Sequence, residues 1–533
     1  MSSDKPVRMR VDNLRVSVAS SGEEILKGVS FELQAGKIFA LVGESGSGKS
    51  VTSMAAMRLL PDALVITDGA VQVSGQDLFD LPESAMQSVR GRRVAMIFQN
   101  AMTALNPVQS VGRQVAETLQ LHTPLRGAAL RERVSALFGE VGIPDAEQRF
   151  DFYPHQLSGG QQQRVMIAMA LACEPDVLIA DEPTTALDVT IQQQVLTLIR
   201  ELTRSRDLAV LLITHDMGVV SNTADEVAVM YRGAIIEQAP VGDFFRNPQH
   251  EYSRRLIAAL PDLTQFQQKE TVEPLLELTD VKVHFPIRRG VFQRVVDYTR
   301  AVDGVSLQIG RGETYALVGE SGSGKSTLGR AILNLDALAG GEIRFSGQAI
   351  QSLPRARMLP FRKQIQVIFQ NPFSSMNPRL RVEDVIAEGM ISLGLGLTPA
   401  ERKARIADLL DRVQLPQNYA RRYPHEFSGG QLQRVAIARA LAVQPELIIC
   451  DEPTSALDVS IRSEVLDLLR ELQQEFGVSY LFITHDLSIV PSLAHHVGVM
   501  RSGVLVEQGS AEQILNAPEH PYTRALLASV PRL

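Results

Sequence analysis

Short runs of consecutive apolar residues recur along the first half of the chain, and each ends beside polar residues. The runs cover residues 38–42, 94–98, 177–180 and 208–213. Stretches of helical periodicity, such as 160–172 and 191–204, lie between them. Strands that alternate with helices predict an α/β fold whose mainly parallel sheet carries helices on both faces. Ligands bind at the carboxyl ends of such strands, where Asp181 and His215 lie.

Two longer segments, 102–152 and 373–423, have helical periodicity without strand-like runs. We expect each to form a helical subdomain inserted into a sheet. The two segments occupy corresponding places in a chain that repeats itself.

The repeat consists of four motifs in the same order. GESGSGKS occurs at 43–50 and 319–326, and SGGQ, DEPT and THD each recur later. The offset is 276 residues for the loop lysines (325 − 49) and 270 for the SGGQ serines (428 − 158). A tandem duplication of one large domain follows. We predict units at 1–260 and 275–533, joined by a polar linker at 261–274 that proline residues bracket.

Composition narrows the class of protein. The 533 residues carry a net charge of −7, so a general attraction to nucleic acid is not expected. The N-terminal segment lacks the apolar core of a signal peptide, and no apolar run approaches the roughly 20 residues that span a bilayer. The two cysteines, Cys173 and Cys450, are expected to be reduced core residues. A cytosolic or peripheral membrane protein is the expectation.

The glycine-rich motif follows a strand and opens a helix, which is the context of a phosphate-binding loop. Its backbone N–H groups and the helix N-terminus would hold phosphates. Lys49 and Lys325 would reach the β- and γ-phosphates, and Ser50 and Ser326 would bind Mg²⁺. The expected nucleotide-binding residues here are Gly43, Glu44, Ser45, Gly46, Ser47, Gly48, Lys49, Ser50, Val51, Gly319, Glu320, Ser321, Gly322, Ser323, Gly324, Lys325, Ser326 and Thr327.

Two carboxylates follow the third strand of each copy. Asp181 and Asp451 suit a Mg²⁺ contact, and Glu182 and Glu452 suit the general base that polarises the attacking water. Taken alone, such pairs fit solvated strand ends equally well. Their place, with Glu182 133 residues after Lys49 (182 − 49) and the other motifs in order, favours the catalytic interpretation.

Four further polar residues end strands. His215 and His485 are expected to contact the γ-phosphate, although a lone histidine is more often structural. Gln99 and Gln370 suit contacts to the metal shell and to water, while a polar strand end explains them as well by chemistry alone.

The SGGQ motif opens a helix and therefore offers a second anion site. The residues are Ser158, Gly159, Gly160 and Gln161, and Ser428, Gly429, Gly430 and Gln431. One unit would then have two phosphate-binding ends but one evident base. The imbalance disappears if the two units face each other.

The ordered set of glycine loop, Gln, SGGQ, DE, ALD and THD resembles the ATP-binding-cassette (ABC) ATPases over nearly the whole chain. The resemblance implies two tandem α/β cassettes, each with a P-loop core, an inserted helical subdomain and an antiparallel β portion. It implies ATP and Mg²⁺ as ligands. It also implies head-to-tail pairing, in which Lys49 works with the second SGGQ and Lys325 with the first, and both sites look competent. Asp188 and Asp458 would sense the opposite site.

Such cassettes usually stack adenine on an aromatic residue of an early strand. By this resemblance Phe285 takes that role in the second copy, whereas the first copy has Val18. Apolar contact would replace stacking there, with a loss of stacking energy.

Each copy ends in a similar extension, NPQHEYSRR at 247–255 and APEHPYTRA at 517–525. HPYT after a cassette is similar to the ATPases of bacterial oligopeptide, dipeptide, nickel and glutathione importers. An ordinary helix cap is the alternative, and the similar segment after both cassettes weighs against it. The resemblance implies peptide import through two separate membrane permease subunits, an indirect link to a periplasmic solute-binding protein, and a peripheral place on the inner membrane. The four cluster-binding cysteines of many relatives are missing, so no iron–sulfur cluster is expected.

The alternative is a duplicated cassette ATPase acting on ribosomes or DNA. Cassette ATPases that act on ribosomes have a long charged linker and a basic composition, and those that act in DNA repair have zinc-binding cysteines. The acidic composition and the short linker weigh against it.

Overall fold

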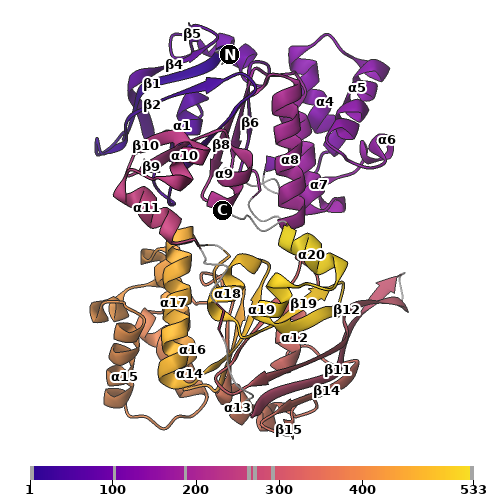
Figure 1. The fold of residues 1–533 in the computed structure, drawn as a ribbon, viewed down its shortest axis with the longest axis vertical. Coiled ribbons are helices and arrows are strands. Elements are labelled where there is room, and N and C mark those ends of the chain that lie inside the picture. Colours follow the sequence, from indigo (N-terminus) through magenta and orange to yellow (C-terminus); the bar gives the residue numbers. More distant parts are fainter. Residues whose placement is uncertain are drawn as a thin grey trace. The chain divides into compact units, whose positions relative to one another are not determined.

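The computed structural model describes residues 5–99, 104–184, 189–260, 266–267, 273–289, 294–455 and 457–528. The chain forms two compact units that divide after Ala258 (Figure 1). The exact bounds 1–260 and 275–533 remain predictions, because most of the predicted linker 261–274 lies outside the described residues. Asp188 also lies outside them.

The main sheet of unit 1 has six strands in the order β10-β9-β3-β8-β7-β6. All neighbours except β9 and β10 run parallel. The bounds are β3 Ile38–Val42, β6 Val94–Ile97, β7 Val177–Asp181, β8 Ala209–Thr214, β9 Glu226–Tyr231 and β10 Ala234–Pro240. β3, β7 and β8 are buried throughout because helices cover one face of the sheet, while a second sheet and further helices cover the other. The predicted strands therefore formed as expected.

A second, antiparallel sheet of unit 1 has the order β2-β1-β4-β5. Its strands are β1 Val7–Val18, β2 Glu24–Gln34, β4 Leu64–Val73 and β5 Gln76–Asp77. Side chains of its inner face, such as Leu14 and Phe31, share a core cluster with Leu41 of the main sheet. Helix α1 (Lys49–Ala56) contributes Ala55 to the same cluster, and α2 (Glu83–Val89) contributes Met86. This packing fixes where α1 starts relative to the parallel strands.

Most of the remaining helices of unit 1 pack beside the main sheet, and the last two, α10 and α11, form the end of the first copy. The bounds are α4 Val111–His122, α5 Gly127–Glu140, α6 Ala146–Arg149, η1 Pro154–Gln156, α7 Gly159–Leu171, α8 Val189–Ser205, α9 Met217–Thr223, α10 Val241–Arg246 and α11 Glu251–Ala258. One core cluster joins Leu119 of α4, Phe138 of α5 and Val165 of α7 to Leu178 of β7. The helical insertion predicted at 102–152 is thus observed over its described part.

Unit 2 repeats this architecture. Its sheets have the orders β16-β17-β18-β13-β19-β20 and β12-β11-β14-β15. The strands are β11 Pro274–Arg289, β12 Arg294–Gly310, β13 Thr314–Val318, β14 Gly340–Phe345, β15 Gln348–Ala349, β16 Ile365–Ile368, β17 Leu447–Asp451, β18 Ser479–Thr484, β19 His496–Arg501 and β20 Val504–Ser510. The helices are α12 Lys325–Ile332, α13 Arg355–Gln364, α14 Val382–Ser392, α15 Pro399–Arg412, η2 Gln417–Arg421, η3 Pro424–Glu426, α16 Gly429–Leu441, α17 Val459–Phe476, η4 Leu487–Ile489, α18 Val490–Leu493, α19 Ala511–Asn516 and α20 Pro521–Ala528. The predicted α/β class with an antiparallel portion in each cassette is confirmed.

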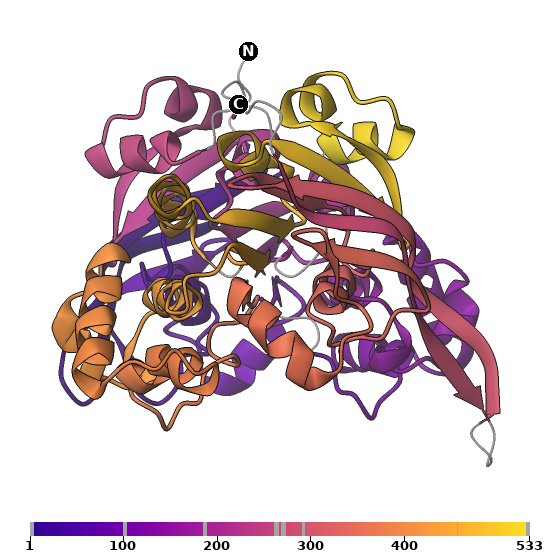
Figure 2. The same ribbon diagram turned by 90° about the horizontal axis from the view of Figure 1, so that it is seen from below.

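The two copies differ in the length of the first hairpin, which is longer in unit 2. Strands β11 and β12 pair from Pro274↔Gly310 out to Arg289↔Arg294, but β14 pairs with β11 only as far as Lys282. Beyond Lys282 the hairpin continues as a two-stranded ribbon, which projects from the unit and whose described side chains are exposed from Phe285 onwards (Figure 2).

Among the described helices, none is long and apolar enough to cross a bilayer. Cys450 is buried, as expected, and burial raises the pKa of its thiol. The expectation of a buried Cys173 is wrong: this residue is half-buried, at the surface where its Sγ contacts the carbonyl oxygen of Thr118.

Candidate functional site

The glycine loop of unit 1 turns tightly between β3 and α1. Gly43 has φ 152° and Gly48 has φ 108°, values that side-chain-bearing residues rarely adopt. A Cβ on Gly43 would lie 2.2 Å from the carbonyl oxygen of Met230, and one on Gly324 of unit 2 would lie 2.0 Å from that of Ala301. Space and backbone geometry both require glycine, which lets the backbone N–H groups turn inward as an anion nest.

The loop lysines lie folded over their own loops. Lys49 Nζ donates to the carbonyl oxygens of Gly43 (2.7 Å) and Glu44 (2.9 Å). Lys325 does the same with Gly319 and Glu320, at 2.8 Å each. The buried ammonium groups are therefore held at the mouth of the nest, where a polyphosphate would lie.

A serine and an aspartate meet below each loop. Ser50 Oγ donates to Asp181 Oδ1 (3.2 Å), and Ser326 Oγ to Asp451 Oδ1 (2.8 Å). Burial raises the pKa of both aspartates, and the serine hydroxyls oppose the rise. Desolvated carboxylates of this kind gain most from a nearby divalent cation.

The predicted base, histidine and glutamine converge in each unit. Glu182 accepts a hydrogen bond from Gln99 Nε2 (2.7 Å), and its other oxygen lies 3.1 Å from His215 Nδ1. Glu182 has φ 46°, in the left-handed region, directly after β7. This costly conformation turns the carboxylate out of the strand direction and towards the site.

Unit 2 has the same cluster. Glu452 (φ 47°) accepts from Gln370 Nε2 (2.8 Å) and lies 3.2 Å from His485 Nδ1. Burial raises the pKa of Glu452, but the contact with His485 and the positive charge of Lys325 outweigh it, so the pKa is lowered overall. The carboxylate is thus ionised at neutral pH, as a general base must be.

The SGGQ segments start α7 and α16 with reciprocal caps. Ser158 Oγ accepts from the N–H of Gln161 (3.3 Å), and Gln161 Oε1 accepts from the N–H of Ser158 (3.2 Å). A Cβ on Gly160 would lie 2.5 Å from Ile191 Cγ2, and one on Gly430 equally close to Ile461 Cγ2. The second glycine of the motif therefore permits helix packing, a role that the sequence alone did not reveal.

The two adenine candidates differ in their surroundings. Phe285 lies on the projecting ribbon with 42% of its surface exposed. Val18 ends β1, paired with Leu64 of β4. The aromatic ring of the second copy is thus available for stacking, and the first copy offers an aliphatic side chain instead.

Two contacts around the loops were absent from the sequence-based prediction. Ser53 Oγ gives Asp181 a second hydroxyl partner at 3.4 Å, whereas glycine, Gly329, occupies the matching place in unit 2 (53 + 276). The hydroxyl group of Tyr252 lies 3.3 Å from the N–H of Glu44. Ser53 is three residues after Ser50 on one helix face, so the first contact had a sequence signal; the second had none.

The residues present fit MgATP. Each loop combines left-handed glycines, a buried lysine and a helix start, and each serine–aspartate pair supplies the oxygen ligands that Mg²⁺ prefers. When bound, the ion would neutralise charge on the phosphates.

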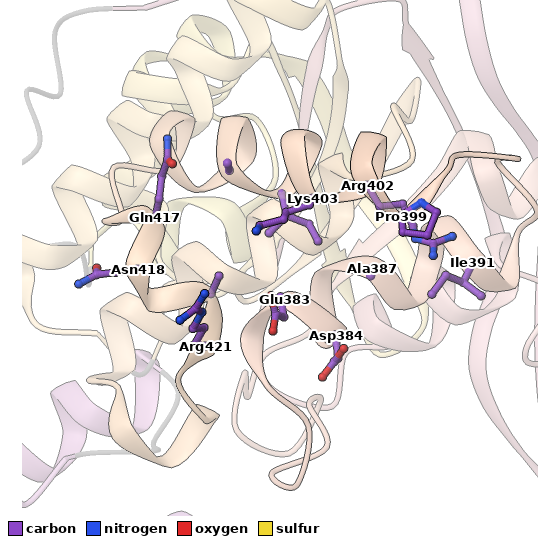
Figure 3. Close-up of a pocket in the computed structure, with 13 residues that line it drawn as sticks. Glu383, Asp384, Ala387, Ile391, Pro399, Arg402, Lys403, Gln417, Asn418 and Arg421 are labelled. Carbon is purple, nitrogen blue, oxygen red and sulfur yellow. The ribbon is translucent and has the colours of Figure 1, made fainter.

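A separate cavity of about 580 Å³ lies between α14, α15 and η2 (Figure 3). Its walls carry Glu383 and Asp384 on one side, and Arg402, Lys403 and Arg421 on others. Ala420 also lines it.

Unit 1 fills the corresponding place. Phe150 stands eight residues before its SGGQ serine, as Ala420 does. The Phe150 ring packs so closely that a Cβ on Gly112 would lie 2.3 Å from it, and Arg131 stacks above it at 4.1 Å. At least two residues differ here, because Ala420 stands in place of Phe150 and Glu383 stands in place of Gly112.

Together, these features define a duplicated P-loop nucleotide hydrolase with an inserted helical portion in each copy. The family model "ABC transporter" matches residues 26–185 and 302–455, and the model "Oligopeptide/dipeptide transporter, C-terminal region" matches 236–280 and 506–533. The chain belongs to the ABC transporter family and is an ATP-binding protein whose ATPase activity is coupled to transport. The resemblance inferred from the motifs is confirmed.

Relatives extend over nearly the full length. The chain is 48% identical to "Peptidoglycan transport ATP-binding protein YejF" of Agrobacterium fabrum, over 94% of this chain and 92% of that protein. It is 47% identical to "Glutathione import ATP-binding protein GsiA" of Escherichia coli K12, over 98% and 89% respectively. A solved cassette dimer described as a post-hydrolysis state bound to ADP and Pi is 29% identical, with a TM-score of 0.41 over 44% of this chain and 99% of that one.

Proposed function

We propose that this chain is the energy-coupling subunit of a bacterial importer for peptides, working through two separate permease subunits. The observation that carries the proposal is the oligopeptide/dipeptide transporter C-terminal region, which follows both cassettes at 236–280 and 506–533. A ribosome- or DNA-directed ATPase would not need it, and the relatives named above are transport proteins.

Both ATP sites are proposed to be competent. Each unit holds its own glutamate within hydrogen-bond reach of a glutamine and close to a histidine, and its own serine–aspartate pair. In this proposal Glu182 and Glu452 accept the proton of the attacking water, Gln99 and Gln370 orient them, and His215 and His485 contact the γ-phosphate.

Composite sites are part of the same proposal. The loop of Lys49 would be completed by the helix start at Ser428–Gln431, and the loop of Lys325 by that at Ser158–Gln161. ATP would then join the two copies and hydrolysis would release them. Gln99 and Gln370 end strands that lead towards the helical insertions, and these would pass the motion to the permeases at the cytoplasmic face of the inner membrane.

Membrane reconstitution tests the function. The full-length chain is to be co-expressed with the permease subunits of its transport system, purified in detergent and placed in liposomes with the solute-binding protein. ATP-dependent uptake of a labelled tripeptide supports peptide import. Uptake of glutathione without other peptides narrows the substrate, and recovery of the chain with ribosomes instead of permeases refutes the proposal.

A further inference from the structure

A buried tyrosine from the last described helix of each copy contacts the glycine loop. Tyr252 of α11 accepts a hydrogen bond from the backbone N–H of Glu44 at 3.3 Å, across 208 residues of sequence. Tyr522 of α20 accepts one from Glu320 at 3.2 Å. The two rings are 4% and 7% exposed. Because the same contact occurs in both copies, it belongs to the shared design of the cassettes.

The extension is anchored so that this hydroxyl group has a fixed position. Glu237 accepts hydrogen bonds from the backbone N–H groups of Gln249 (2.7 Å) and His250 (2.9 Å). His250 Nδ1 then accepts the N–H of Tyr252 at 3.1 Å. Burial raises the pKa of Glu237, but these donors outweigh it and lower the pKa overall. The carboxylate therefore stays charged and holds the segment.

Unit 2 uses equivalent residues. The carboxylate of Glu507 accepts hydrogen bonds from the backbone N–H groups of Glu519 (2.7 Å) and His520 (3.1 Å). His520 Nδ1 accepts the backbone N–H of Tyr522 at 3.1 Å. The shared histidine and tyrosine of HEYS and HPYT thus have separate tasks. The histidine caps the helix start, and the tyrosine reaches the loop.

The end of a sheet strand braces each ring. Tyr231, the last residue of β9, lies 4.3 Å from Tyr252 between ring centroids. In unit 2 the equivalent residue is Arg501 (231 + 270), whose guanidinium lies 4.8 Å from the Tyr522 ring. Aromatic and cation–π packing of this kind restrict the ring's position.

The same strand end supports the loop from behind. The carbonyl group of Met230 abuts Gly43, and the N–H of Gly233 donates to Ser47 at 3.0 Å. The loop is therefore held on its outer side at Gly43, Glu44 and Ser47. The support at Glu44 comes from the C-terminal extension, not from the sheet.

We infer that Tyr252 and Tyr522 are positioning residues for nucleotide binding: their hydroxyl groups hold the second residue of each glycine loop and so keep the phosphate nest in its binding shape. Backbone N–H groups bind phosphate well only when they already point inward. This inference rests on the assignment of the two loops as the ATP sites. It gives the extension after each cassette a task at the nucleotide.

The test is the removal of the two hydroxyl groups from the full-length chain. Tyr252→Phe, Tyr522→Phe and the double variant keep the rings against Tyr231 and Arg501. Loss of one neutral hydrogen bond weakens binding about 3- to 10-fold. We expect this rise in Kd for both MgATP and MgADP at the altered site, because both present phosphates to the same loop. KM for ATP should rise with kcat unchanged within about twofold.

Tyr480→Phe is the matched control. Tyr480 is a fully buried tyrosine whose hydroxyl group donates to the carbonyl oxygen of Leu469 at 3.0 Å, within unit 2. It should lower thermal stability without changing nucleotide affinity. Lys49→Ala and Lys325→Ala test the loop assignment separately, since both should abolish binding at their sites. Unchanged Kd values in the double tyrosine variant, or an equal loss in Tyr480→Phe, would overturn the inference.

Discussion

Replacement of the two candidate bases tests the chemistry most directly. Glutamine has the shape of glutamate, and in unit 2 both the Gln370 amide and His485 Nδ1 approach the same oxygen, Glu452 Oε2. The carbonyl oxygen of a glutamine can take this place, so Glu452→Gln should preserve the local contacts. What it loses is the ability to accept a proton.

The expected loss follows from that single change. A positioned general base contributes about 10²- to 10⁴-fold to a rate, which corresponds to a barrier about 2.7–5.4 kcal/mol higher. We therefore expect Glu182→Gln/Glu452→Gln to hydrolyse ATP at least 100-fold more slowly than the wild type, with MgATP affinity retained. Single variants show whether the sites depend on each other: half the rate remains if they are independent, and almost none if each turnover needs both.

Phosphate release at saturating MgATP, together with nucleotide binding, measures both quantities in the purified full-length chain. Glu313→Gln is the control. Glu313 is also a buried glutamate beside a histidine, with 7% exposure and 2.5 Å between Oε1 and His496 Nδ1, but it lies at the start of β13. A double variant that keeps more than a tenth of the wild-type rate refutes the assignment, as does an equal loss in Glu313→Gln.

Three further changes test the packing and electrostatics of the units. Gly160→Ala should destabilise unit 1 by about 1–3 kcal/mol in urea unfolding, because its methyl group meets Ile191, and Ile191→Ala should restore part of the loss. Glu313 raises the pKa of His496 above 6.5, while His496 outweighs burial and lowers the pKa of Glu313 below 4.5. The raised pKa of His496 stabilises the fold below pH 6.5, and the lowered pKa of Glu313 stabilises it above pH 4.5. The contribution of the pair to the free energy of unfolding should therefore peak between these pH values and vanish in His496→Ala. Ala420→Phe should lower the thermal midpoint of unit 2, because Glu383 occupies the place of Gly112, where a Cβ would lie 2.3 Å from the ring; a higher midpoint would show that the hollow accepts a ring.

Sequence reasoning located the nucleotide site because its chemistry is local. Apolar runs ending at Asp181 and before His215 became parallel neighbours β7 and β8, so their terminal residues met at one edge of the sheet. The glycine loop carried its own signal, since only glycine tolerates φ 152° at position 43. The cluster of Gln99, Glu182 and His215 also required the neighbouring order of β6, β7 and β8 and the left-handed backbone at Glu182, neither of which the sequence predicted.

Contacts made across long sequence separations had no such signal. Nothing near Tyr252 in the chain points to Glu44, and the importance of Gly160 depends on how close α8 passes. The half-buried state of Cys173 likewise depends on α4, which supplies its partner Thr118. These features depend on tertiary packing, which a single sequence without related sequences does not report.

The ribbon of unit 2 has a consequence for how its ATP site opens. Past Lys282, strands β11 and β12 pair only with each other, and an isolated two-stranded hairpin is marginally stable in water. Its amide protons should therefore exchange with solvent well before those of the neighbouring sheet. Phe285, the proposed adenine contact, lies in this segment. A nucleotide that stacks on its ring would stabilise the paired ribbon by the free energy of that contact, and the amide exchange of the ribbon would slow accordingly. Nucleotide affinity at the second site would then include the cost of ordering the ribbon, a cost that the shorter hairpin of the first site does not carry.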